Sequence, residues 1–237
     1  MKVLFAGPSL PDAARLAASA VEVRPPAVHG DVLAAVRAGA TAIGIVDGNF
    51  EYVAPVWHKE ILHALEAGVA VFGAASMGAM RAAECAAFGM VGIGSIYDDY
   101  ATGRRVDDAD VALLHGPAEL GYPALSLALV NAEATLDGLE ARRQLARDDL
   151  ARLRAAARLI FYKERTWPAI LDRATITENR AGLLQLILAE NVDRKREDAC
   201  ALIAALCDPA PQSPAKRGDW TFRATSLWRR AAAQPET

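Results

Sequence analysis

Ser76 stands where a strand-like run gives way to a helical pattern. Residues 69–72 are apolar, a turn of small residues follows, and the Ala-rich sequence after Ser76 has helical spacing. A serine at this point can cap the helix by accepting a hydrogen bond from an unpaired N–H of the first turn. Ala74-x-Ser76-x-Gly78 also approximates the G-x-S-x-G turn that exposes a nucleophilic serine. The local sequence leaves both roles open, and the cap is the commoner one.

The turn before this helix is also suited to an anion. The first N–H groups of a helix have no intrahelical partner, and the helix dipole favours negative charge there. Backbone N–H groups between Gly73 and Gly78 are therefore candidates for holding an oxyanion. Arg81 lies further along the same helix, and its planar guanidinium can clamp a carboxylate. Arg81 and Glu84 are also three residues apart, a spacing that suits a structural salt bridge.

Two histidines are candidates for a general base. His58 opens a helical pattern, beside Lys59, and His115 follows an apolar run. Asp47 or Glu84 would orient the imidazole. For His115, a purely structural position at the end of a strand is an equal alternative.

The sequence gives weak signals for a metal. His58 and His63 are five residues apart, which misses the i, i+4 spacing of a helical metal site. Asp107, Asp108 and Asp110 could bind magnesium, but a solvated acidic loop is the favoured interpretation. We therefore expect no metal ion and no organic cofactor.

Composition predicts a globular protein of the reducing cytoplasm. The 237 residues are 53% hydrophobic with a mean hydropathy of +0.13, which excludes disorder. Three cysteines form no CxxC pair, and the N-terminus lacks the apolar core of a signal peptide. No uncharged apolar run approaches the ~18 residues of a membrane span. Without such a run we expect no membrane partner, and because basic and acidic residues are interleaved in the C-terminal part we expect no nucleic acid partner.

The elements that must position these residues alternate between strand and helix. We expect strands at 3–7, 21–23, 41–46 and 69–72, and helices at 12–20, 31–38, 55–67 and after Ser76. This alternation predicts an α/β fold with a parallel sheet flanked by helices. Ligand sites of such sheets lie at the carboxyl ends of the strands. We therefore expect four side chains to face one cleft there, those of His58, Ser76, Arg81 and His115.

The later chain is built differently. Residues 1–138 carry 8 Lys and Arg against 16 Asp and Glu, whereas residues 139–237 carry 18 against 13. We expect an α/β core domain over 1–138 and an all-helical C-terminal region over 139–237. The finer expectations are an irregular stretch at 95–106, a strand at 111–114, a helix at 123–136, one long helix at 139–158, and packing of the segment 220–228 onto the main body.

Several motifs in a fixed order resemble the TfuA-like proteins. The resemblance covers about residues 1–135. Its motifs are Asp47-Gly-x-Phe50, His58-Lys-Glu-Ile-Leu62, Gly73-Ala-x-Ser-Met-Gly-Ala-x-Arg-Ala-Ala-Glu84, Phe88-Gly-Met-x-Gly92, Tyr97-x-x-Tyr100, Asp107-Asp-x-Asp-Val-Ala112 and His115. The acidic block departs from the family pattern, because it reads Asp-Asp-Ala-Asp where Asp-Asp-Glu is expected.

The resemblance implies a role beside YcaO enzymes, which activate a peptide amide with ATP. In thioamide-forming systems, including ribosomal peptide (RiPP) biosynthesis, the TfuA-like partner is thought to help supply sulfur. One route is release of sulfide from the thiocarboxylated C-terminus of a ubiquitin-like sulfur carrier protein. The implied partners are therefore a YcaO enzyme, the carrier and the precursor peptide.

Two functions follow, with a third as a weaker option. As a hydrolase, the protein would use N–H groups from Ser76 to Gly78 for the oxyanion, Arg81 and Lys59 for the anionic tail, and a histidine as base. The catalytic residues would then be Ser76, His58, His115 and Glu84, and the other substrate-binding residues Asp47, Gly48, Gly73 and Tyr97. As a non-catalytic adaptor, the same cleft would only grip the carrier tail. The third option is a generic serine hydrolase.

Overall fold

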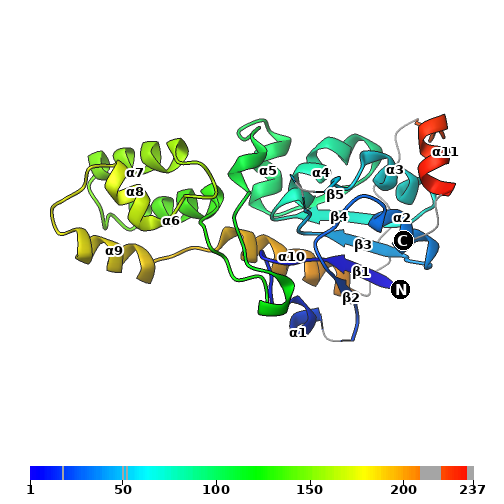
Figure 1. Cartoon of the computed structure of the whole chain (residues 1–237), viewed down its shortest axis with the longest axis horizontal. Helices are drawn as coiled ribbons and strands as arrows, with labels where there is room; N and C mark the ends of the chain where they lie inside the picture. The colour runs from blue at the N-terminus through cyan, green and yellow to red at the C-terminus, as the bar shows by residue number, and fades with distance from the viewer. Residues whose placement is uncertain (18, 50, 52, 209–219, 234–237) are drawn as a thin grey trace.

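A five-stranded parallel sheet forms the centre of the protein (Figure 1). The structure is a computed structural model and describes residues 1–237 except 18, 50, 52, 209–219 and 234–237. The strand order is β2-β1-β3-β4-β5, with β1 Lys2–Phe5, β2 Glu22–Arg24, β3 Ala42–Ile45, β4 Ala70–Ala74 and β5 Val91–Ile93. The predicted α/β fold with a parallel sheet is confirmed, and its first four strands lie where the apolar runs placed them.

Both faces of the sheet are covered by helices, which is why its central strands are apolar at every position. Helices α2 (Asp31–Arg37), α3 (His58–Glu66) and α4 (Met77–Cys85) pack on one face. Helices α1 (Ala13–Ala17) and α10 (Arg194–Cys207) pack on the other. Gly44 of β3 lies directly under α10, because a Cβ there would come within 2.6 Å of Leu202.

The C-terminal part divides into three pieces. Helices α6 (Leu129–Ala141), α7 (Arg147–Leu159), α8 (Trp167–Arg173) and α9 (Arg180–Ala189) form a helical lobe with its own apolar core, at the left of Figure 1. Helix α10 then returns to the sheet, and α11 (Ser226–Ala233) lies beside α3. All regular elements described after residue 138 are helical, as predicted. Position 138 itself falls inside α6.

The short strand β5 and helix α5 (Ser95–Ala101) were not predicted from the sequence. The start of α5 is held by the carboxylate of Asp198 on α10, which accepts from the N–H groups of Ser95 at 3.1 Å and Ile96 at 2.8 Å. Burial raises the pKa of this carboxyl group. Because the group that holds the helix start lies about a hundred residues away, the local pattern of residues 95–106 looks irregular.

Three further expectations compare with the structure as follows. The long helix expected at 139–158 is two helices, since the chain turns at Arg143, whose φ is 54°. The strand expected at 111–114 is wrong, and the helix expected at 123–136 begins at Leu129. The packing of 220–228 is confirmed, because Trp228 lies 5.2 Å from His63 between ring centroids.

Arg165 joins the parts of the helical lobe. The residue is 3% exposed, and its guanidinium donates to the carbonyls of Ala157 at 2.9 Å, Ile160 at 3.0 Å and Leu127 at 3.3 Å. The Leu127 N–H donates back to the Arg165 carbonyl at 2.7 Å. One side chain therefore satisfies the end of α7 and the approach to α6 together.

We predict that Arg165→Met lowers the free energy of unfolding by about 3 kcal/mol or more, because it leaves buried carbonyls without donors. The measurement is urea unfolding followed by circular dichroism. Arg154→Met is the matched control, because Arg154 pairs with Asp137 and Glu140 at the surface of the same lobe. It should cost less than about 1 kcal/mol. Equal losses for the two variants would contradict the role given to Arg165.

Candidate functional site

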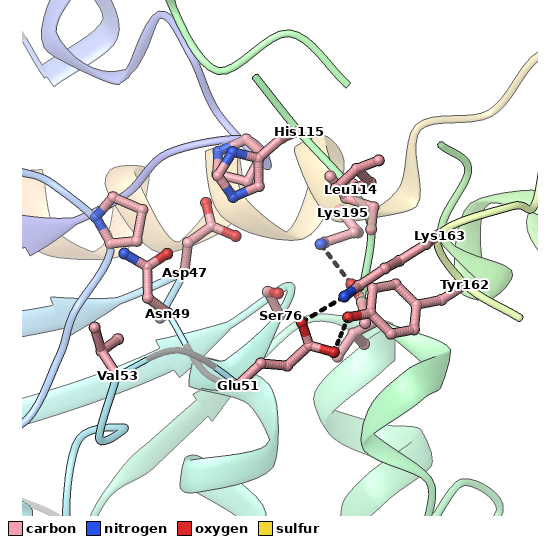
Figure 2. Close-up of a pocket in the computed structure, with 16 residues that line it drawn as sticks. Asp47, Asn49, Glu51, Val53, Ser76, Leu114, His115, Tyr162, Lys163 and Lys195 are labelled. Atoms are coloured by element: carbon pink, nitrogen blue, oxygen red, sulfur yellow. Dashed lines mark hydrogen bonds and ion pairs between the residues drawn. The ribbon is translucent and has the colours of Figure 1, made fainter. Parts of the chain in front are cut away.

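A pocket of about 320 Å³ opens at the carboxyl edge of the sheet, between the loops that follow β1 and β3. The chain leaves these two neighbouring strands in opposite directions, toward β2 and toward β4, so they flank the switch point where parallel α/β sheets bind ligands. The polar side chains around the pocket are those of Asp47, Asn49, Glu51, Ser76, His115, Tyr162, Lys163 and Lys195 (Figure 2).

Asp47 organises the floor of this pocket. The residue is buried, with 2% of its surface exposed. Its carboxylate accepts hydrogen bonds from the N–H groups of Gly7 at 2.8 Å and Ser9 at 3.0 Å, and from the Ser9 hydroxyl at 2.5 Å. The carboxylate therefore ties the loop after β1 to the end of β3. Its hydrogen bonds among the described residues are all to that loop, so the expected role of orienting a histidine is wrong. Gly48 beside it packs under Met77, whose sulfur a Cβ would approach to 2.3 Å.

Ser76 lies in the pocket at the N-cap of α4, but its side chain makes no capping hydrogen bond. The turn before it is tight, because the Ser76 N–H donates to the Ala74 carbonyl at 2.7 Å and Ala75 has a φ of 66°. A non-glycine residue at this φ in a three-residue turn is strained, and such strain is concentrated at functional sites. The structure thus leaves the hydroxyl for the pocket instead of the helix.

The backbone N–H groups expected to hold an oxyanion are largely used. The Ser76 N–H bonds Ala74, and the Gly78 N–H donates to the Val46 carbonyl at 3.2 Å. Gly78 lets the start of α4 approach the end of β3 closely, since a Cβ on it would lie 1.7 Å from the Ile45 carbonyl oxygen. In the same way, a Cβ on Gly73 would lie 2.0 Å from the Gly78 carbonyl oxygen. Close packing explains why both positions are glycine, and the binding roles expected of Gly73 and Gly78 stay predictions.

Lys195, at the start of α10, was missed by the sequence analysis. It is 2% exposed, and its ammonium donates to the Val111 carbonyl at 2.7 Å. Burial lowers the pKa of this lysine. The residue stands in a segment of alternating charges, so no local signal marks it.

His115 lies across the pocket from Ser76 (Figure 2). Its Nδ1 is 2.7 Å from the Gly116 carbonyl, which assigns the proton to Nδ1 because a carbonyl oxygen can only accept. In the neutral form of this ring the lone pair is on Nε2, and that tautomer can act as a base.

The helical lobe supplies one wall. Tyr162 donates its hydroxyl to Glu51 at 2.5 Å, and Lys163 pairs with the same carboxylate at 2.7 Å (Figure 2). Burial, with Glu51 as a further cause, raises the pKa of Tyr162 to about 12. The sequence analysis named none of Glu51, Tyr162 and Lys163 as site residues. Tyr162 and Lys163 come from the loop between α7 and α8, far in sequence from the core motifs.

His58, Arg81 and Glu84 form a separate cluster. Glu84 accepts from Arg81 at 2.7 Å and lies 2.8 Å from His58 Nε2, and both neighbours lower the pKa of its carboxyl group. Arg81 also donates to the Val56 carbonyl at 3.2 Å. Arg81 and Glu84 line a groove next to α5 and not the Ser76 pocket. The expected single cleft is therefore wrong: Ser76 and His115 share one pocket, and His58 and Arg81 belong to another site.

Two further expected binding residues are placed elsewhere. Lys59 donates to the Arg223 carbonyl at 2.6 Å and lies 4.8 Å over the Phe222 ring, so it holds the C-terminal segment. The Tyr97 ring covers Gly92, where a Cβ would come within 2.0 Å of it. Neither side chain lines the pocket.

Over the described residues, no three His, Cys, Asp or Glu side chains are grouped as metal ligands would be. Asp107 instead accepts from the Ala109 N–H at 2.9 Å, and Asp110 pairs with Arg105 at 2.7 Å. In the same part of the chain, every helix is too short or too polar to cross a bilayer.

The sequence model of the family described as TfuA-like protein matches residues 47–166 of this chain. The match begins at Asp47 on the pocket floor and ends just after the wall residues Tyr162 and Lys163. A comparison with curated proteins finds none that matches.

We predict that Cys85 does not react with iodoacetamide in the native protein at pH 8. Burial raises the pKa of its thiol to about 12, so the reactive thiolate is scarce. Cys207 is exposed and should react first. Peptide mass spectrometry after short labelling measures both, with labelling in urea as the control that Cys85 can be detected. Native labelling of Cys85 at the rate of Cys207 would contradict the prediction.

Proposed function

The chain belongs to the TfuA-like family, and on that premise we propose that it releases sulfide from the thiocarboxylated C-terminus of a ubiquitin-like sulfur carrier. The sulfide then serves a YcaO enzyme that forms peptide thioamides. The protein would act as a hydrolase that works beside the YcaO enzyme.

One observation carries this proposal: Ser76, on a strained turn and with no side-chain capping hydrogen bond among the described residues, and His115, whose Nδ1 faces the Gly116 carbonyl, line the same pocket at the switch point of the sheet. The pocket, of about 320 Å³, suits a narrow substrate. A tail that ends in Gly-Gly has no side chains and can enter it extended.

The reaction needs water, and its atoms balance without a cofactor. The water oxygen bonds to the thiocarboxylate carbon, the C–S bond breaks, and a carboxylate and hydrogen sulfide leave. In our assignment His115 takes the proton from water and returns it to the departing sulfur. Ser76 donates a hydrogen bond to the oxyanion that forms on the carbonyl oxygen.

The assignment of Ser76 as donor, and not as nucleophile, follows from its neighbours. In the described residues the Ser76 hydroxyl has no histidine as a hydrogen-bond partner, and a nucleophilic serine needs an adjacent base. This favours water as the attacking group and disfavours the generic serine hydrolase. His58, paired with Glu84 in the other groove, has no part in the step.

The alternative is a non-catalytic adaptor that grips the carrier tail and binds the YcaO enzyme. Exposed apolar side chains at the end of α7 favour it, since Leu159 is 67% exposed and Phe161 is 56% exposed. Incubation of the purified protein alone with thiocarboxylated carrier separates the two functions. Sulfide release without the YcaO enzyme supports the hydrolase, and release only in its presence supports the adaptor.

We predict that Ser76→Ala lowers the rate of sulfide release at saturating carrier by about 10²-fold, the usual effect of removing one oxyanion donor. The protein should stay folded, because the side chain makes no cap hydrogen bond. A loss of several powers of ten would instead indicate a nucleophile. The measurement is sulfide release against carrier concentration, with circular dichroism for folding.

Two variants control this experiment. Ser95→Ala changes a serine at the start of α5, outside the Ser76 pocket, and should keep the full rate. Arg81→Ala alters the separate groove, so any loss should appear in half-saturation and not in the rate at saturation. An unchanged rate for Ser76→Ala would place the reaction outside this pocket.

A further inference from the structure

Lys195 is a buried cation with spare hydrogen-bonding capacity. A lysine ammonium has three N–H donors. Among the described residues, the side chain of Lys195 makes one hydrogen bond, to Val111, and no ion pair. Its backbone N–H is held by the Asn131 side chain at 3.1 Å, which fixes the start of α10 against α6. Figure 2 shows the ammonium beside the space that Ser76, Asp47 and His115 surround.

Two carboxylates, those of Asp47 and Asp193, act on Lys195 through their charge, but both hydrogen-bond to other groups. Asp47 accepts three hydrogen bonds from the loop after β1. Asp193 accepts from the Arg196 N–H at 3.1 Å and from the Asn131 side chain at 2.9 Å. A buried ammonium without a contacting anion is unfavourable, so this pocket is suited to an anionic ligand.

The charge balance of the pocket selects the kind of anion. Lys163 is paired with Glu51, so these two charges cancel. Asp47 lies on the floor, so the four charged side chains that line the pocket sum to zero. Lys195 is the one among them whose hydrogen-bonding capacity is unfilled in the described residues, so it can take one negative charge beside it, such as a carboxylate or thiocarboxylate, while Asp47 opposes a ligand of higher negative charge. The pocket does not match a phosphate dianion or a nucleotide.

We propose that Lys195 recognises the terminal charge of the bound tail, by donating from its free N–H groups to the carboxylate or thiocarboxylate end of an extended Gly-Gly peptide. The identity of the tail rests on the proposed function. Lys195 is then the specificity-determining residue that distinguishes a free C-terminus from an amide. It comes from α10, outside the region matched by the family model.

The test compares two fluorescein-labelled octapeptides that end in Gly-Gly and differ only at the C-terminus, carboxylate in one and amide in the other. Fluorescence polarisation measures their binding to the full-length protein. We expect the carboxylate peptide to bind at least about tenfold more tightly, as a buried charge pair requires. Equal affinities for the wild-type protein would overturn the proposal without any variant.

Lys195→Met should remove the preference for the carboxylate and bring the two affinities within about twofold of each other, because the cation that donates to the terminal group is lost. A merely structural role would weaken both peptides alike and keep their ratio, which would overturn the proposal. Arg154→Met is the control that removes a cation outside the pocket, on the surface of the helical lobe, and should keep the preference for the carboxylate. Inorganic phosphate should compete weakly. Strong competition by phosphate would contradict the selection of a single charge.

The two proposals fail in different ways. If binding depends on the terminal charge but no sulfide is released, the proposed hydrolase function is refuted and Lys195 remains the recognition residue of an adaptor. If sulfide is released but the carboxylate and amide peptides bind equally, the hydrolase function stands and the proposed role of Lys195 is refuted. Thermal melting of each variant confirms that the binding data come from folded protein.

Discussion

The start of α4 lies against the end of β3 with no side chain between them, and the site depends on this contact. A Cβ on Gly78 would meet the Ile45 carbonyl at 1.7 Å, and the Gly78 N–H instead bonds the Val46 carbonyl at 3.2 Å. The strained turn at Ala75 is what lets the chain leave β4 and reach this position. As a result Ser76 and Asp47, which end neighbouring strands, share one pocket.

The pocket is completed by parts of the chain outside the parallel sheet. Tyr162 and Lys163 come from the helical lobe, and Lys195 comes from the helix that returns to cover the sheet. Arg165 holds the lobe together just after the wall residues. The packing of the helical lobe therefore determines one wall of the pocket.

Buried charges in this protein fall into two kinds. Glu60 accepts from the N–H groups of Gly30, Trp57 and Leu33, and Asp198 holds the start of α5. Such groups have several partners and serve the fold, since hydrogen bonds repay the cost of burial. Lys195 has one partner among the described residues and faces a pocket. That contrast separates a structural charge from one that is suited to a ligand.

The sequence by itself determined the first four strands, the strand-turn-helix at Ser76 and the edge of the sheet that carries the pocket, because these follow from apolar runs and a general rule of parallel sheets. Tertiary structure decided the rest. Arg81 is five residues past Ser76, about 140° around the helix, and so faces another groove. The contact that holds the start of α5 and the placement of Lys195 both depend on α10, which follows the helical lobe in the chain and packs back on the sheet. A local sequence pattern reports on residues that lie within one or two helical turns of each other. Contacts between residues a hundred positions apart depend instead on how the helices and the sheet pack in three dimensions.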